Sequence, residues 1–567
     1  MTRPVGQSSM AKWLLLLLFC FFAPQAQAYG DEIVRPKPPE VRKNNELSIG
    51  IPAPVAGLHP YLDRGAASRY AQGLVLRPLM AFDANWQLVC MLCAVMPSNE
   101  AGTIRQEFYD GSKQGVAITV TLKPGLRWGD GRPLTAEDAA FTASLTEHLP
   151  PSLGGLRKVT VDSPQQFTLH FRDLSVELTA LTDFYPLPKA LEQAAVGADY
   201  AKNSRYRRTP FDPGLYNGAY ILTDSWNGGW LFTANASFSG AKPQLQTLRL
   251  QRAPSVAAAL SSYDRGAYTM LAWDLLATTE ETARYSEQNA GRFNAVVRPS
   301  ALFEHIALNL ENPLLTDRRS RLALLLGLDR AAMNQAAFRG NAVVAPAFIS
   351  PLDRSFNNDL PIQTLNRERA KQLLGDAGFK LGADGVLVAP NGQRFTLTLL
   401  TTEGNASRAM LQQMITNSWK QIGVEVQPKL VPASELLSTI LPQRRFEGAV
   451  LFAIASFPDA AATSLLHSQS IPNQRNEFSG QNYSGYKNPT MDGLLENLDK
   501  TTSIAYRLQL RRAMQQIYSA DLPSLPLFFR PARYLLPIGA TGIPSTAHQF
   551  PATLWVEDWR FVINDDN

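Results

Sequence analysis

The order of apolar and polar positions predicts strands that alternate with helices along most of the chain. Residues 116–122 (VAITVTL) combine β-branched side chains with period-two alternation, which is typical of a half-buried strand. Strands alternating with helices of this length indicate open α/β sheets in more than one lobe. Further strand patterns occur at 159–171 (two strands around a turn), 220–223, 230–233, 245–250, 305–310, 395–400, 424–426, 446–454 and 525–529.

Local signals place the ends of several helices. Thr135 precedes a helical pattern and Asp138 follows three residues later, which is a variant of the capping box. A strongly apolar helix is expected from Thr316 or Asp317 to about Ala337. The other predicted helices are 255–265, 367–377 and 406–422, each followed by a glycine suited to a left-handed C-cap, and 507–519.

The first residues form a separate pattern. Arg3 and Lys12 precede the apolar run 13–23, and the small-residue pattern Ala-Gln-Ala follows it and ends at Ala28. This order is typical of a secretory signal peptide, and the apolar run of 11 residues is shorter than the roughly 20 that span a bilayer. We therefore expect cleavage after Ala28, an extended leader at 29–45, and an exported protein; a lipoprotein cysteine at Cys20 is the disfavoured alternative because Phe19 precedes it.

Length and charge narrow the class of protein. At about 150 residues per domain, 567 residues correspond to three or four domains or two large lobes. The 54 Lys and Arg residues exceed the 49 Asp and Glu residues by only five, which argues against a nucleic-acid-binding protein.

The mature chain has two cysteines, in the motif Cys90-Met91-Leu92-Cys93. No second Cys or His pair stands near it for a zinc site, and the segment lacks the βαβ setting of a redox motif. A local disulfide or two buried thiols is the favoured interpretation, with the redox and metal interpretations left open.

No motif in the chain points to catalysis. G-x-S-x-G, a P-loop, G-x-G-x-x-G after a strand and H-E-x-x-H are all absent, and the six histidines never fall at metal-ligand spacing. We therefore expect a binding protein rather than an enzyme, without a cofactor or a metal.

Segments spread over nearly the whole mature chain resemble, in the same order, one bacterial family. Residues 122–142 (LKPGLRWGDGRPLTAEDAAFT) carry its first signature through Gly125, Trp128, Asp130, Gly131, Thr135, Ala136 and Asp138. Residues 304–330 carry a second through Asn309, Asp317, Arg319, Arg321, Asp329 and Arg330. Shorter similarities are at 217–238, 367–379, 419–427, 482–495 and 522–530. The chain resembles the extracellular solute-binding proteins of family 5, the periplasmic oligopeptide-, dipeptide- and nickel-binding proteins of ABC transporters.

This resemblance implies an α/β, two-lobed periplasmic-binding-protein fold of class II (cluster C) with mixed sheets and a hinge between the lobes. The implied first lobe is 46–303 plus 525–567, with the family's extra subdomain at about 75–190. The implied second lobe is 304–524, and the hinge crossings fall at 305–309 and 524–528. The charged residues Asp317, Arg319, Arg321 and Asp329 are expected to form salt bridges around a helix.

The sequence departs from the family at the expected ligand site. Peptide-binding members resemble one another in an Asp, after the strand matching 446–454, that pairs with the peptide's α-ammonium. Here the segment reads FAIASFPDAAATSLL, so Ser456 stands where the Asp is expected and Asp459 comes three residues later. We hypothesise that Ser456, Phe457 and Asp459 line the cleft.

The implied function is the periplasmic solute-binding component of an ABC importer, delivering a peptide or peptide-like solute to a membrane permease with a cytoplasmic ATPase. The implied protein is a monomer that binds no nucleic acid. Three alternatives remain: a non-peptide solute (an opine, a sugar or a metal chelate), a ligand-sensing or chaperone-like periplasmic protein without import, and a secreted hydrolase.

Overall fold

The computed structural model describes residues 45–174, 178–197, 199–456 and 462–562. Its first sheet has five strands in the order β11 (Met270–Leu271), β1 (Glu46–Ile51), β10 (Thr247–Arg252), β9 (Gly229–Ala234) and β8 (Tyr220–Trp226). β1 is parallel to β10 and β11, whereas β10, β9 and β8 are antiparallel. Alternate residues of β1 and β10, such as Leu47 and Leu248, are fully buried in the first core. The predicted strands at 220–223, 230–233 and 245–250 are confirmed.

Within the described ranges, six helices accompany this sheet along the chain, and three of them begin at a side-chain cap. Ser255 caps α6 (Val256–Asp264), and Thr279 caps α7 (Glu280–Gln288). The other helices of this part are α1 (Ala66–Val75), α3 (Lys189–Glu192), α4 (Tyr200–Asn203) and α5 (Arg205–Arg208).

A second core belongs to an antiparallel sheet in the order β4 (Ile104–Tyr109), β5 (Lys113–Thr121), β7 (Gln166–Phe171) and β6 (Leu156–Ser163), which packs with α2 (Ala136–Ser144). The predicted capping box of α2 is present: Asp138 accepts a hydrogen bond from the Thr135 backbone N–H at 3.0 Å. A hairpin of β2 (Met80–Phe82) and β3 (Leu88–Cys90) adjoins this core, and Cys90 and Cys93 form a disulfide with Cα atoms 5.1 Å apart. The favoured structural interpretation of the C-x-x-C motif is thus confirmed.

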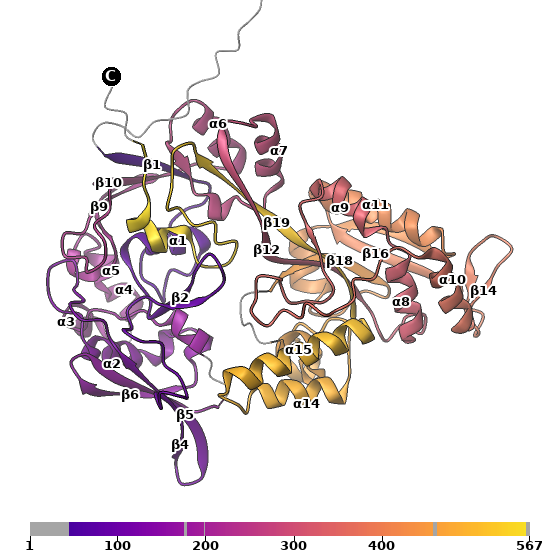
Figure 1. The fold of residues 1–567 in the computed structure, drawn as a ribbon, viewed down its shortest axis with the longest axis horizontal. Coiled ribbons are helices and arrows are strands. Elements are labelled where there is room, and N and C mark those ends of the chain that lie inside the picture. Colours follow the sequence, from indigo (N-terminus) through magenta and orange to yellow (C-terminus); the bar gives the residue numbers. More distant parts are fainter. Residues whose placement is uncertain (1–44, 175–177, 198, 457–461, 563–567) are drawn as a thin grey trace, which may run out of the picture. The chain divides into compact units, whose positions relative to one another are not determined.

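The third sheet is mixed and has six strands. Their order is β13 (Val343–Val344), β19 (Ser524–Pro537), β12 (Phe293–Leu308), β18 (Ala449–Ala455), β16 (Thr396–Thr402) and β17 (Glu425–Val431). Figure 1 shows α8 (Arg318–Leu326), α9 (Arg330–Phe338), α10 (Arg367–Asp376) and α11 (Ala406–Lys420) around this sheet, with α14 (Pro489–Leu498) and α15 (Ile504–Asp521) beside one another below it. The remaining α-helices and strands are β14 (Lys380–Leu381), β15 (Leu387–Val388), α12 (Ala433–Glu435) and α13 (Thr463–Leu466).

Two long strands connect the first core with that of the six-stranded sheet. β12 and β19 pair antiparallel from Phe293↔Pro537 to Ala307↔Ser524, with a register shift between Pro299 and Phe303. At one end Val296 and Leu535 pack in the first core, and at the other Ile306 and Leu525 pack in the other core. The crossing between the two cores is therefore a paired ribbon of β-structure.

Two sequence expectations were wrong in this region. The expected single helix at 317–337 is two helices, α8 and α9, because Asp329 caps a new helix start by accepting from the Ala332 N–H at 2.9 Å. The expected salt-bridge set is mostly a set of backbone contacts. Asp317 pairs with Arg319 at 2.6 Å, but buried Arg321 donates to four carbonyl oxygens, those of Leu315, Thr316, Asp521 and Leu522.

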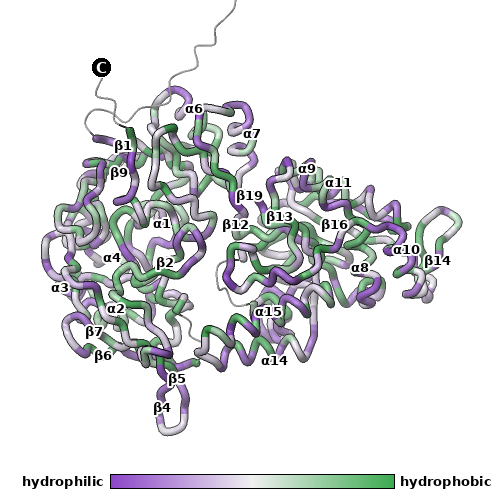
Figure 2. The backbone as a smooth tube through the Cα atoms, viewed as in Figure 1, coloured by the Kyte–Doolittle hydropathy of each residue, from purple (hydrophilic) through white to green (hydrophobic). Residues whose placement is uncertain are grey.

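Hydropathy follows this architecture: in Figure 2 the turn that joins β4 to β5 is largely hydrophilic, whereas apolar positions recur along the sheets. Among the described residues, no helix combines the length and apolar character needed to cross a bilayer.

Candidate functional site

A pocket of about 70 Å³, which we call the polar pocket after the charged and polar side chains among its mixed lining, lies at the end of β18, in the part of the molecule built on the six-stranded sheet. Ser456 follows β18 directly and is held by its backbone N–H, which donates to the Ala301 carbonyl at 2.6 Å. Its lining includes exposed Ser464 and Gln481 and buried Phe348 and Ile349. The predicted site residue Ser456 therefore lines a real cavity.

The pocket holds two buried charges of opposite sign. Asp353 is 7% exposed, and its Oδ1 accepts from the Ser355 backbone N–H at 2.7 Å and the Ser355 hydroxyl at 2.6 Å. Arg511, on α15, is 3% exposed. A carboxylate accepts from an ammonium group, and a guanidinium donates to a carboxylate.

Gln515, one turn after Arg511, fixes the loop that carries Asp353. Its side chain is fully buried, donates to the Ser355 carbonyl at 2.7 Å and accepts from the Asn357 N–H at 3.1 Å. Buried backbone groups left without such partners would cost about 1–3 kcal/mol each. The position of Asp353 relative to α15 is therefore set by specific hydrogen bonds.

A second, aromatic pocket of about 20 Å³ shares Ile454, Leu465 and Gln481 with the first. His305 lies in its wall, with its ring parallel to Phe303 at 5.0 Å and 4.5 Å from the ring centroid of Phe452. Burial lowers the pKa of His305 to about 4, so this imidazole is neutral at pH 7. The other aromatic residues of this wall are Tyr483 and Tyr518. A volume of about 20 Å³ accommodates about one water-sized group.

Successive side chains of a strand point to opposite faces, so Glu304 contacts different partners from His305. Glu304, next to His305 on β12, is fully buried and pairs with Arg408 at 2.8 Å and with Arg530 at 3.7 Å. Glu304 is not among the residues that line either pocket, so Asp353 is the acidic residue that the described residues bring to this site.

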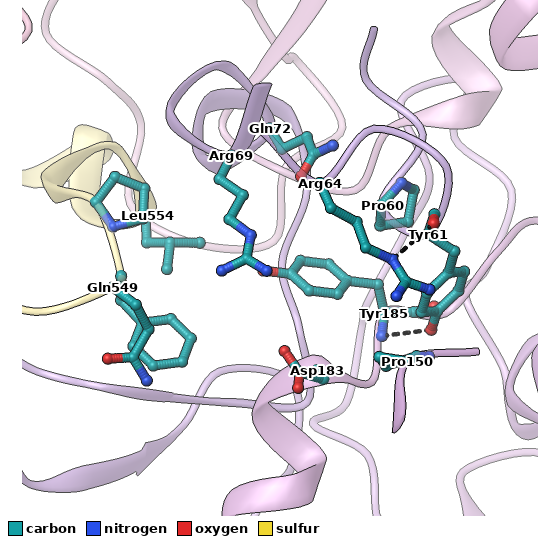
Figure 3. Close-up of a pocket in the computed structure, with 12 residues that line it drawn as sticks. Pro60, Tyr61, Arg64, Arg69, Gln72, Pro150, Asp183, Tyr185, Gln549 and Leu554 are labelled. Carbon is teal, nitrogen blue, oxygen red and sulfur yellow. Dashed lines mark hydrogen bonds between the residues drawn. The ribbon is translucent and has the colours of Figure 1, made fainter. Parts of the chain in front are cut away.

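A third pocket, of about 50 Å³, belongs to the part built on the first two cores. Figure 3 shows Arg69 reaching toward the hydroxyl of Tyr185, with Asp183 and Gln549 nearby. The hydroxyl of Tyr61 donates to the Tyr185 carbonyl at 2.8 Å and accepts from the Tyr185 N–H at 2.9 Å, which fixes the wall. This pocket is also polar and also holds charges of both signs.

Of the three site residues expected from the sequence, Phe457 and Asp459 lie outside the described residues. Sequence reasoning missed Asp353 and Arg511. Asp353 follows a proline-containing segment without periodicity, and Arg511 is one of several arginines on a predicted helix, so no local signal singles out either one. Within the described ranges, no group of three or more His, Cys, Asp or Glu side chains is arranged to hold a metal ion.

Comparison with known proteins agrees with this architecture. The family model "Bacterial extracellular solute-binding proteins, family 5 Middle" matches residues 106–472. The oligopeptide-binding protein AppA of Bacillus subtilis is 28% identical over 439 residues, which are 73% of this chain and 75% of that protein. The glutathione-binding protein GsiB of Pectobacterium atrosepticum is 26% identical over 498 residues, 84% of this chain and 87% of that protein.

The fold is shared with solved two-lobed binding proteins. NikA from Brucella suis, in complex with Fe(III)-EDTA, superimposes with a TM-score of 0.70 at 15% identity and covers 91% of this chain and 100% of its own. The predicted α/β two-lobed fold is thus confirmed. Together, the family match and the arrangement of sheets place this chain in family 5 of the bacterial extracellular solute-binding proteins.

Proposed function

We propose that this protein is the solute-binding component of an ABC importer, and that it takes up a peptide with a free amino terminus. The observation that carries the proposal is the pocket beside Ser456, where Asp353 and Arg511 are both buried. The oligopeptide- and glutathione-binding relatives support a peptide or peptide-like solute.

In this proposal, Asp353 takes the role that the family gives to the Asp missing at Ser456. Its carboxylate accepts from the peptide's α-ammonium. Truncating one partner of a desolvated charge pair costs about 2–5 kcal/mol. Ser456 lies in the same wall, and the proposal that Phe457 and Asp459 also line the cleft remains a prediction.

We further propose that the lobes are 46–303 plus 525–567 and 304–524, and that they close on the solute by bending at β12 and β19. This is supported by the way both strands pass from one core to the other. The pocket of Figure 3 would then contribute from the first lobe.

Signal-peptide cleavage after Ala28 would deliver the protein to the periplasm as a monomer that binds without turnover. A membrane permease with a cytoplasmic ATPase would receive the solute there.

A non-peptide solute is the second candidate, favoured by Ser456 standing in the place of the family's ammonium-binding Asp. The chelate in the NikA complex illustrates that the fold accommodates such a ligand. In that case Arg511 would bind a carboxylate of the solute.

Native mass spectrometry of the protein from its own host's periplasm, followed by denaturing release, separates these candidates. A set of short peptides is the expected result. A single non-peptide mass would overturn the peptide proposal and favour the second candidate. If the protein emerges empty, the same measurement after incubation with a mixture of synthetic di- to pentapeptides decides, and failure to retain any of them would contradict the proposal.

A further inference from the structure

A groove with a volume of about 500 Å³ lies on the part built on the six-stranded sheet, away from the residues that line the polar pocket. It runs between α8, α10, the last turns of α15 and the segment 359–363. Its apolar lining residues are Leu322, Leu360, Pro361, Leu373 and Ala520. A hollow of this size, lined by both polar and apolar side chains, can receive several side chains of another molecule.

Two arginines from different helices border this groove. Arg318 on α8 and Arg369 on α10 are exposed, and neither side chain has an ion pair or hydrogen bond within the described residues. Arg319 differs, because Asp317 pairs with it at 2.6 Å and the Asp376 carbonyl accepts from it at 2.6 Å. Asp359 is the acidic residue that lines the groove, so the surface carries an excess of positive charge.

The groove and the polar pocket are built on the same two segments. The loop that carries Asp353 in the pocket continues to Asp359 in the groove, and α15 contributes Arg511 to the pocket and Gln516 to the groove. Gln515 ties the two segments together through Ser355 and Asn357. A molecule seated in the groove would therefore contact segments that also hold the solute.

We propose that this groove docks an acidic extracytoplasmic segment of the membrane permease. Two carboxylates of that segment pair with Arg318 and Arg369, and an apolar side chain between them packs on Leu322 and Leu373. The proposal rests on the import function above. The lining combines arginines with leucines and a proline, which fits a peptide segment with acidic and apolar side chains better than a row of phosphates, because phosphates would leave the apolar side chains uncovered.

Site-specific photo-cross-linking in cells of the natural host tests this proposal. Benzoylphenylalanine replaces Gln516, which is exposed and lines the groove, and as a control it replaces Tyr506, which is exposed near the other end of α15. The double variant Arg318→Glu/Arg369→Glu reverses the groove's charge. Lys371→Glu is the matched control, because Lys371 is an exposed cation of the same helix as Arg369 and does not line the groove.

The expected result is a cross-link from position 516 to a permease segment that contains at least two acidic residues. Its yield should fall about tenfold in the double variant, which corresponds to 1.4 kcal/mol, and by less than about twofold in Lys371→Glu. A cross-link to phospholipid or to a second copy of this chain, a yield unchanged by charge reversal, or no cross-link specific to position 516 would each overturn the proposal.

The same preparations keep this result separate from the import function. The double variant should release the same solutes on denaturation as the wild type, since Arg318 and Arg369 do not line the pocket. If the wild type carries a non-peptide solute but the cross-link is formed and lost as expected, the peptide proposal fails and the docking surface stands. If peptides are carried but no permease is captured, the docking proposal fails alone.

Discussion

The pocket beside Ser456 and the groove beside Arg318 share a loop and a helix, yet they present charge in opposite ways. In the pocket, Asp353 and Arg511 are almost fully buried and the sign of charge is mixed. In the groove, Arg318 and Arg369 are exposed and of one sign. Buried charges contribute to selectivity because each must be matched, whereas exposed charges steer a partner and are screened by salt. One scaffold thus provides one surface suited to selective solute binding and another suited to transient docking.

Of the changes that test this comparison, Asp353→Asn is expected to have the largest effect, on the affinity for the solute. Loss of the carboxylate leaves an α-ammonium without its charged partner in a desolvated pocket, so the affinity for a carried peptide should fall about a hundredfold, or roughly 3 kcal/mol. Isothermal titration calorimetry measures it. Asp359→Asn is the matched control, because Asp359 is exposed, follows on the same loop and lines the groove. Equal affinities for both variants would remove Asp353 from the site.

A smaller effect is expected for the pH dependence of the unfolding free energy, through His305 in the wall of the aromatic pocket. Burial lowers the pKa of His305 to about 4, against 6.5 in the unfolded chain, so the unfolded state binds more protons between these values. Stability contributed by neutral His305 is therefore complete above about pH 7 and is lost as the pH falls toward 4.

Between pH 7 and pH 5, the wild type should lose about 1–2 kcal/mol more unfolding free energy than His305→Gln. Urea denaturation at the two pH values gives this difference. The contributions of His59 and His548, whose pKa values burial also lowers, cancel between the two proteins. Parallel pH profiles would mean that His305 is already charged or solvated in the folded state.

Raising the salt concentration is expected to have the smallest effect on solute affinity. It should have a clear effect on cross-linking at the groove. The Debye length falls from about 10 Å at 0.1 M to about 3 Å at 1 M ionic strength, which screens exposed arginines more than buried groups. Over this range the peptide affinity should change by less than about twofold, while the cross-link from position 516 should weaken severalfold in membranes from the host. If salt weakens solute binding as much as cross-linking, the contrast between the two surfaces does not hold.

Local sequence signals predicted many elements of this fold correctly, because they act over a few residues. The Thr135–Asp138 capping box and the glycines that follow α10 and α11, Gly378 and Gly423, have the expected conformations. The break between α8 and α9 was missed, since an apolar run hides a new helix start at Asp329. Apolar periodicity gives the face of a helix but not its interruptions.

The site was less predictable because it is assembled over long distances in the sequence. Ser456 was found by its place after a recognisable strand. Asp353 and Arg511 come together with it only through the tertiary packing of α15 against the loop, which Gln515 fixes by hydrogen bonds to Ser355 and Asn357. Neither the residue types nor their spacing in the sequence predicts that Asp353 and Arg511 line the same pocket. The extent of β12 was also underestimated, because its pairing with β19 depends on a partner far along the chain.

The measurement that tests the central claim most directly compares one released peptide with its N-acetylated form in calorimetric titrations of the wild-type protein. Acetylation removes the ammonium charge and leaves the side chains and the carboxylate unchanged. The account predicts that acetylation weakens binding by about a hundredfold, and that in Asp353→Asn the two forms differ by less than about threefold. Equal affinity of the two forms for the wild type would contradict it, because the buried carboxylate would then have no part in recognising the amino terminus.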